Sequence, residues 1–182
     1  MNLETATFAG GCFWCTEAIF KRLRGVESVL PGYSGGFVEN PTYEQVCSGN
    51  TGHAESIQIE FKPEVISYEK LLEIFFHLHD PTTLNRQGND VGSQYRSIIF
   101  YHDVRQKELA ERVRDKIADE GVYHDPILTE IVPFEKFYLA EDYHENYYER
   151  NKDKPYCQYV IDPKLQKLVK GYSKDLKSSD EA

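Results

Sequence analysis

One cysteine near the start of the chain is predicted to lie where a short strand turns into a helix. Residues 7–18 read TFAGGCFWCTEA, and the two glycines allow a sharp turn directly before Cys12. The apolar residues that follow recur at near-helical spacing, at Phe13, Ile19, Phe20 and Leu23. Free backbone N–H groups and the helix dipole at such a position lower the pKa of a thiol from about 8.5. Cys12 is therefore the candidate nucleophile.

Cys15 follows three residues later, and the pair allows three interpretations. A thioredoxin-type disulfide motif has this placement, but the Gly-Pro pair usual between such cysteines is missing. Half of a zinc site would need a second ligand pair, whereas Cys47 and Cys157 stand alone in the sequence. A single nucleophile with a neighbouring thiol fits the pattern best, with Cys15 interpreted as a packed helix residue.

Glu55 is the candidate proton donor, because it begins a predicted strand beside a loop rich in aromatic residues and glycine. Most glutamates are simply solvated. Burial among aromatic side chains would instead raise the pKa of Glu55, so that it holds a proton at neutral pH as a general acid must.

Five further residues fit a site around these two groups. Phe13 and Trp14 offer an apolar wall beside the nucleophile, such as a substrate pocket needs, although packing in the core is the commoner role of such aromatics. Tyr43 and Tyr95 are hydroxyl donors in predicted loops. Asp90 could join them, or could serve only as a turn residue.

The elements that must position these residues follow from periodicity and chain breakers. Residues 56–61 alternate polar and apolar side chains, which indicates a half-buried strand. Ser67 and Asp103 are N-cap residues that begin two amphipathic helices. We predict strands over residues 5–9, 26–33, 56–61, 97–101 and 127–134, helices over 13–23, 68–79 and 104–120, a short helix within 137–150, extended chain over 157–161 and then a basic tail.

The order strand, helix, strand, strand, helix, strand up to Tyr101 is that of the split βαβ unit. The predicted fold class is therefore α+β, a two-layer ferredoxin-like sandwich with appended helices and an irregular C-terminal segment. It forms a single domain over residues 1–182, with residues 178–182 disordered. The first strand–helix turn and the two long loops would then gather the following residues at one end of the sheet: Cys12, Tyr43, Glu55, Asp90 and Tyr95.

The composition excludes several classes of protein. With 40% hydrophobic and 28% charged residues the chain is globular, and no apolar run approaches the roughly 20 residues of a membrane helix. The N-terminus does not resemble a signal peptide. A net charge of −9 argues against binding to nucleic acid. We expect a cytoplasmic protein with four reduced cysteines. A catalytic or metal-binding role for these cysteines is then more plausible than structural disulfides.

Blocks spread over residues 5–161 resemble the A-type peptide methionine sulfoxide reductases, in the right order. They read GGCFWCTEA at 10–18, YSGG at 33–36, a tyrosine at 43, GHAE at 52–55, HDPT at 79–82, GND with GSQYR at 88–96, and AEDYH at 140–144. Several motifs matched together make the resemblance specific. The C-terminus departs from it, because the glycine-rich tail with two cysteines found in some members is absent.

The resemblance implies thiol-dependent reduction of methionine S-sulfoxide, free or in proteins. It assigns Cys12 as nucleophile, Glu55 as proton donor, Tyr43, Asp90 and Tyr95 as polar partners of the sulfoxide oxygen, and Phe13 with Trp14 as the cradle of the methyl group. Cys12 would become a sulfenic acid and then a disulfide, which an external dithiol, expected to be thioredoxin, reduces. No metal and no organic cofactor is expected, and we expect a monomer.

We predict Cys157 as the thiol that resolves the sulfenic acid. Cys157 follows a polar segment predicted to be mobile, and the resemblance places the recycling cysteine of many members in this region after a tyrosine. Cys15 is the alternative, because three residues along a helix is a feasible disulfide spacing; Cys47 is the weakest candidate. Two other functions also remain: a general disulfide oxidoreductase using Cys12 and Cys15, and a noncatalytic binding module for oxidised proteins.

Overall fold

The computed structural model describes residues 2–178 of the chain. Of the segment predicted to be disordered, residues 178–182, all but Ser178 lies outside the described residues. None of the described helices is long and apolar enough to cross a membrane.

The strands are β1 (Glu4–Gly10), β2 (Val26–Ser34), β3 (Ala54–Phe61), β4 (Arg86–Gln87), β5 (Asp90–Val91), β6 (Ser97–Tyr101), β7 (Glu130–Pro133) and β8 (Tyr138–Leu139). The helices are α1 (Phe13–Phe20), α2 (Tyr43–Cys47), α3 (Tyr68–Leu78), α4 (Val104–Asp119), α5 (Tyr147–Arg150) and α6 (Asp162–Tyr172). Tighter helical turns cover Ser93–Tyr95, Asp142–His144 and Ser173–Asp175, and a wider turn covers Cys157–Ile161.

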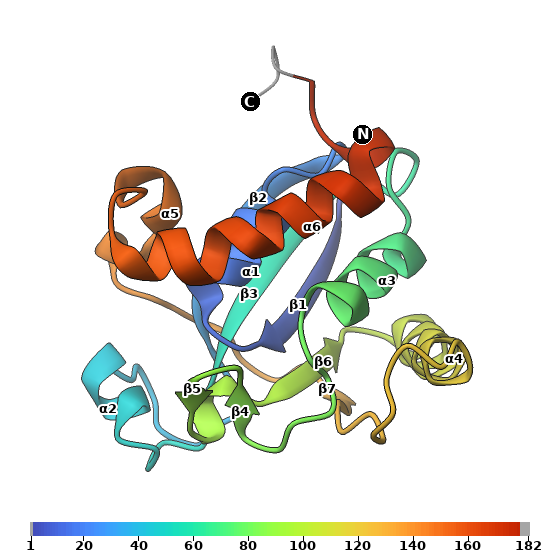
Figure 1. Cartoon of the computed structure of the whole chain (residues 1–182). Coiled ribbons are helices and arrows are strands. Elements are labelled where there is room, and N and C mark those ends of the chain that lie inside the picture. Colours follow the sequence, from blue (N-terminus) through green and yellow to red (C-terminus); the bar gives the residue numbers. More distant parts are fainter. Residues whose placement is uncertain (1, 179–182) are drawn as a thin grey trace.

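The predicted ferredoxin-like unit is confirmed. Its four strands lie in the order β6-β1-β3-β2, and each neighbouring pair is antiparallel (Figure 1). β7 extends the sheet beside β6 in the parallel direction, and β8 extends the other edge antiparallel to β2. The fold is therefore an α+β sandwich with one mixed sheet of six strands.

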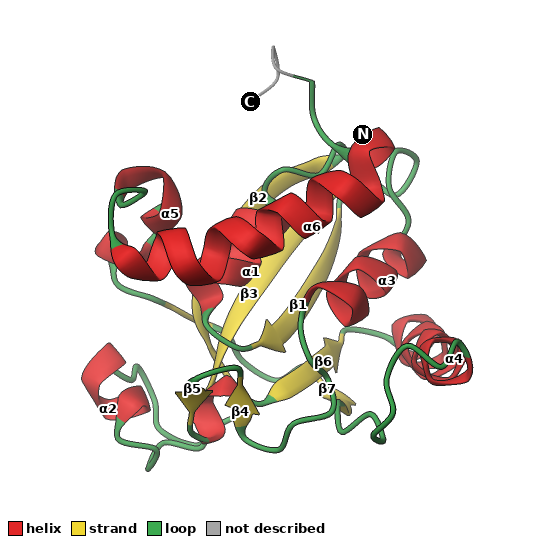
Figure 2. Ribbon diagram, viewed as in Figure 1, coloured by secondary structure: helices red, strands yellow, loops and turns green. Residues whose placement is uncertain are grey.

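Helices α1, α3 and α6 cover one face of this sheet and enclose the main core (Figure 2). Phe8 on β1 shows how the layers meet: its ring centroid lies 5.8 Å from that of Phe20 on α1 and 4.9 Å from that of Phe75 on α3. Each such buried aromatic stabilises the fold by about 1.5–3 kcal/mol relative to an exposed one. This layer fixes α1, and with it Cys12, against the sheet.

The opposite face carries a smaller cluster of Ala9, Ala54, Ile98 and Phe100. The chain between β7 and β8 crosses this face, because Phe134 packs on the cluster and the carbonyl oxygen of Lys136 accepts a hydrogen bond from the Ser34 hydroxyl at 2.5 Å. Successive side chains of a strand point to opposite faces. Residues next to this cluster in sequence, such as Phe8 and Glu55, therefore face the helices.

The prediction of extended chain over residues 157–161 and an irregular tail is wrong. Cys157–Ile161 forms a wide helical turn that continues directly into α6. The physical reason is a helical period in the apolar residues, since Cys157, Ile161, Leu165 and Leu168 are all buried while Tyr159 is 79% exposed. The predicted strand over 127–134 is also shorter than expected, forming only at β7.

Candidate active site

Cys12 is the N-cap residue of α1, as the sequence predicts. Gly11, directly before it, has φ of 91°, a conformation that favours glycine. A Cβ atom at Gly11 would lie 2.6 Å from the Gln87 side chain of β4. The glycine therefore allows the β4–β5 hairpin to approach the turn that presents Cys12.

Cys15 is the third residue of α1, and an N-cap side chain normally reaches the third residue of its helix. The two thiols are accordingly hydrogen-bonding partners. Burial is the largest cause that raises the pKa of Cys12, and the hydrogen bond with Cys15 and the charge of the Glu55 carboxyl raise it further. The prediction of a lowered Cys12 pKa is therefore wrong for the substrate-free site, because desolvation exceeds the effect of an eight-residue helix. The hydrogen bond with Cys12 instead lowers the pKa of Cys15 to about 7.

Glu55 lies on β3 with its carboxyl directed at the start of α1. Its Oε1 atom accepts a hydrogen bond from the Phe13 N–H at 3.2 Å, whereas Oε2 is buried and has no hydrogen-bond partner among the described residues. Burial raises the pKa of Glu55 to about 8, opposed by the Phe13 N–H and increased by Asp90 and Cys15. The carboxyl is therefore mostly protonated at neutral pH, as the sequence predicts for a general acid.

The five residues expected at one end of the sheet do meet there. Tyr95 lies within electrostatic range of Cys12, Glu55 and Asp90, and Tyr43 within range of Glu55 and Tyr95. Burial raises the phenol pKa values of both tyrosines above the ordinary value, and the charge of Glu55 adds to this. Both hydroxyls are therefore protonated donors at neutral pH.

Phe13 and Trp14 form an aromatic wall beside Cys12. Phe13 is fully buried and stacks near Tyr43 at 6.4 Å between ring centroids, so it belongs to the core as well as to the site. Trp14 is only half-buried, and its indole lies flat against the ring of Tyr147 at 3.7 Å. The core interpretation therefore holds for Phe13, while Trp14 keeps an accessible surface.

Tyr156 is a residue of this site that the sequence analysis did not identify. Its hydroxyl donates to Oδ2 of Asp90 at 2.7 Å and lies 3.7 Å from the Cys15 sulfur. Its ring meets Trp14 edge-on at 5.6 Å. The one sequence signal for its position is the helical spacing of the apolar residues Cys157, Ile161 and Leu165, which indicates that a helical turn rather than extended chain follows Tyr156.

Glu141 and His144 are also new to the site, although both belong to the AEDYH block. Glu141 accepts hydrogen bonds from the Tyr33 hydroxyl and the Tyr43 N–H, both at 2.9 Å, and so holds the start of α2. The Nδ1 atom of His144 accepts from the Trp14 indole N–H at 3.0 Å. These contacts join residues 98 to 130 positions apart, which no local pattern could reveal.

The remaining cysteines lie in different surroundings. Cys157 is completely buried in the helical turn after Tyr156, in electrostatic range of Cys15. Cys47 is exposed at the end of α2, and its thiol is a hydrogen-bonding partner of Tyr43. In the described chain all four cysteines are free thiols.

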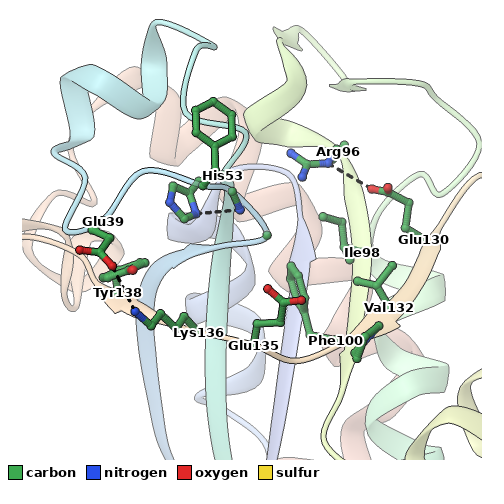
Figure 3. A pocket seen from close by; sticks show the side chains of 14 residues that line it. Glu39, His53, Arg96, Ile98, Phe100, Glu130, Val132, Glu135, Lys136 and Tyr138 are labelled. Carbon is green, nitrogen blue, oxygen red and sulfur yellow. Dashed lines mark hydrogen bonds and ion pairs between the residues drawn. The ribbon is translucent and has the colours of Figure 1, made fainter.

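A separate pocket of about 460 Å³ lies on the opposite face of the sheet, behind the site (Figure 3). There Arg96 donates to Glu130 at 3.1 Å and to the Gly52 carbonyl at 2.8 Å. His53 accepts from the Gly36 N–H at 3.0 Å and donates to the Val38 carbonyl at 2.7 Å, so both ring nitrogens are engaged. These contacts fix the loop before Glu55 from behind.

Comparisons with known proteins agree with this arrangement. The family model described as peptide methionine sulfoxide reductase matches residues 4–177. The peptide methionine sulfoxide reductase MsrA of Sulfolobus acidocaldarius is 61% identical over 93% of this chain and 96% of its own length. Among solved structures, reduced Mxr1 from Saccharomyces cerevisiae is 33% identical with a TM-score of 0.78, covering 85% of this chain and 89% of Mxr1. Mxr1 in complex with Trx2 is 25% identical with a TM-score of 0.54, covering 80% and 84%. The resemblance seen in the sequence is thus confirmed, and the chain belongs to the peptide methionine sulfoxide reductase family, type A.

Proposed function

We propose that this chain reduces methionine S-sulfoxide, free or in proteins, with Cys12 as the nucleophile and Glu55 as the proton donor. One observation carries the assignment of roles. A buried carboxyl with a pKa of about 8 and one oxygen without a partner among the described residues stands beside the candidate thiol. A protonated carboxyl can donate a hydrogen bond to the neutral oxygen of a sulfoxide.

Polarisation of the S=O bond is the first step. Glu55 donates to the sulfoxide oxygen, with the Tyr43 and Tyr95 hydroxyls as further donors, and Asp90 holds Tyr156 at the edge of the site. The sulfoxide sulfur then becomes more electrophilic. Trp14 supplies the accessible apolar surface that receives the methyl group, with the buried Phe13 packed in the wall beside it, and this orients the sulfur toward Cys12.

Nucleophilic attack follows from the thiol pair. The pKa of Cys15 is lowered to about 7 by the hydrogen bond with Cys12, so the Cys15 sulfur is the nearest acceptor for the proton that Cys12 must release. When the Cys12 sulfur attacks the sulfoxide sulfur, the sulfoxide oxygen, carrying the proton donated by Glu55, is transferred to the Cys12 sulfur. The methionine sulfur gains two electrons, the Cys12 sulfur loses two, and the products are methionine and a Cys12 sulfenic acid.

We propose Cys15 as the thiol that resolves the sulfenic acid, in place of Cys157. Cys12 at the N-cap and Cys15 at the third helical position already interact, whereas Cys157 is fully buried in a regular turn and would have to unpack. Attack of Cys15 on the Cys12 sulfur forms a disulfide and releases water. Cys157 stays as the competing candidate.

An external dithiol supplies the two electrons that reopen the disulfide, and the complex of yeast Mxr1 with Trx2 supports thioredoxin in this role. A cytoplasmic location, where thiols are kept reduced, suits a reductase that needs free thiols.

The test is incubation with racemic methionine sulfoxide and dithiothreitol, read by chiral chromatography. We expect consumption of the S epimer alone, and no consumption by Cys12→Ser, because a serine hydroxyl is scarcely ionised at neutral pH. A second candidate function is general disulfide exchange, which the interaction between the Cys12 and Cys15 thiols favours. Disulfide exchange would proceed in a redox buffer without sulfoxide. Binding of sulfoxide without turnover would instead indicate a noncatalytic binding module. Substantial turnover by Cys12→Ser would refute the assignment of the nucleophile.

A further inference from the structure

The indole of Trp14 contacts two aromatic residues of the segment after β8. Tyr147 stacks on it at 3.7 Å with an interplanar angle of 6°, and His144 lies 5.9 Å away at 28°. His144 is fully buried, and its ring also meets Phe13 at 4.9 Å and Tyr43 at 4.4 Å. One imidazole therefore contacts both residues of the aromatic wall and one of the tyrosines of the site.

The hydrogen bond between Trp14 and His144 fixes the state of the imidazole. An indole N–H can only donate, so Nδ1 of His144 must carry a lone pair, and the proton of the neutral ring resides on Nε2. Nε2 is buried and has no hydrogen-bond partner among residues 2–178. Trp14 is thus the one hydrogen-bond partner that the His144 side chain has in the described chain.

We propose that His144 is a positioning residue, whose Nδ1 lone pair holds the indole of Trp14 in the orientation that shapes the methyl site. The inference rests on the proposed function, because it assumes that Trp14 contacts the methyl group of the substrate. His144 would affect sulfoxide binding through Trp14 and would leave the proton transfer from Glu55 unchanged.

A pH dependence follows from the same geometry. Protonation would place a hydrogen on Nδ1, directly opposite the indole N–H, and the hydrogen bond would be lost. Burial lowers the pKa of His144, while the carboxylates of Glu141 and of Glu44 on α2 oppose this shift. Tyr43 and Tyr143, the other titratable groups whose rings face His144, stay neutral in this range. The indole should therefore be held at neutral pH and released in acid.

Trp14 is the sole tryptophan of the sequence, so intrinsic tryptophan fluorescence reports on the surroundings of this one indole. The test compares the wild type with His144→Phe, which keeps a ring but has no acceptor, and with His144→Asn, whose Oδ1 is attached to Cγ as Nδ1 is. The exposed His102, which stacks on Phe134 on the opposite face of the sheet, provides the matched control His102→Phe.

We expect His144→Phe to raise KM for methionine sulfoxide roughly three- to tenfold, the effect of one lost hydrogen bond, with kcat within about twofold of wild type. His144→Asn should restore KM to within about twofold of wild type. Wild-type tryptophan emission should change as the pH falls below about 6.5, the ordinary histidine pKa, and this transition should be absent in both variants but present in His102→Phe.

Two results would overturn the inference. One is equal impairment of the Phe and Asn variants, which would mean that ring volume rather than the acceptor matters. The other is wild-type emission that stays constant through this pH range while far-ultraviolet circular dichroism shows a folded chain, and this measurement needs no variant. Failure of the proposed function would look different, because the wild type would then consume no sulfoxide while the emission transition persisted.

Discussion

The N–H of Phe13 and the Oε1 atom of Glu55 are 3.2 Å apart, and this contact joins the first residue of α1 to the start of β3. This hydrogen bond uses one oxygen of the Glu55 carboxyl to hold the side chain in place. The other oxygen, Oε2, has no hydrogen-bond partner among the described residues and lies in a buried environment that favours the protonated acid.

Glu55→Gln should lower the rate of the reductase step by about 10²–10⁴, the usual contribution of a positioned proton donor. Because burial raises the Glu55 pKa to about 8, the wild-type rate should decline as the pH rises through that value, while the variant lacks this decline. Single-turnover formation of the sulfenic acid at several pH values checks both expectations. An unchanged rate at pH 7 would mean that Glu55 is only structural.

The same substitution should raise stability in alkaline solution. Glu55 binds its proton in the folded state up to about pH 8, whereas an unfolded glutamate releases it near pH 4.3. The folded state therefore loses stability as the pH rises between these values, on the order of a few kcal/mol in total. Urea unfolding at pH 9 should show a higher free energy of unfolding for Glu55→Gln than for wild type, whereas the exposed control Glu108→Gln should show no such increase. Equal stability of the two variants would contradict the burial of an ionisable carboxyl.

Trp14→Ala should impair binding more than folding, because the indole is half-exposed and is proposed to contact the methyl group. We expect KM to rise roughly tenfold or more and unfolding free energy to fall by about 1–2 kcal/mol. Steady-state kinetics beside denaturant unfolding separates the two effects. A loss of several kcal/mol with unchanged KM would identify a core aromatic.

The resolving thiol can be identified by peptide mapping after one equivalent of methionine sulfoxide without reductant. We expect loss of two thiols and a Cys12–Cys15 disulfide. Cys15→Ser should release one methionine and stop with thioredoxin, yet turn over with dithiothreitol, whereas Cys157→Ser is the matched control that keeps thioredoxin-dependent turnover. A Cys12–Cys157 disulfide would restore the candidate that the sequence favoured, and would leave the reductase assignment intact.

The sequence by itself determined the local features of this protein. The glycines before Cys12, the N-cap residues Ser67 and Asp103 and the alternation over residues 56–61 specify turns, helix starts and a strand through interactions within a few residues. The order of these elements is typical of the ferredoxin-like unit. In that unit Cys12 and Glu55 lie at the same end of the sheet.

Only the tertiary structure decided the state of those residues. The pKa values of Cys12 and Glu55 depend on desolvation by distant segments of the chain. Desolvation raises the pKa of Cys12, where the sequence predicts a lowered value, and it raises the pKa of Glu55, as the sequence predicts. The contacts of His144 and Tyr156 join positions 130 and 66 residues apart, and sequence spacing carries no information on such distances. The helical turn at Cys157 likewise forms because its buried face packs on the rest of the core, and that packing exists only in the folded chain.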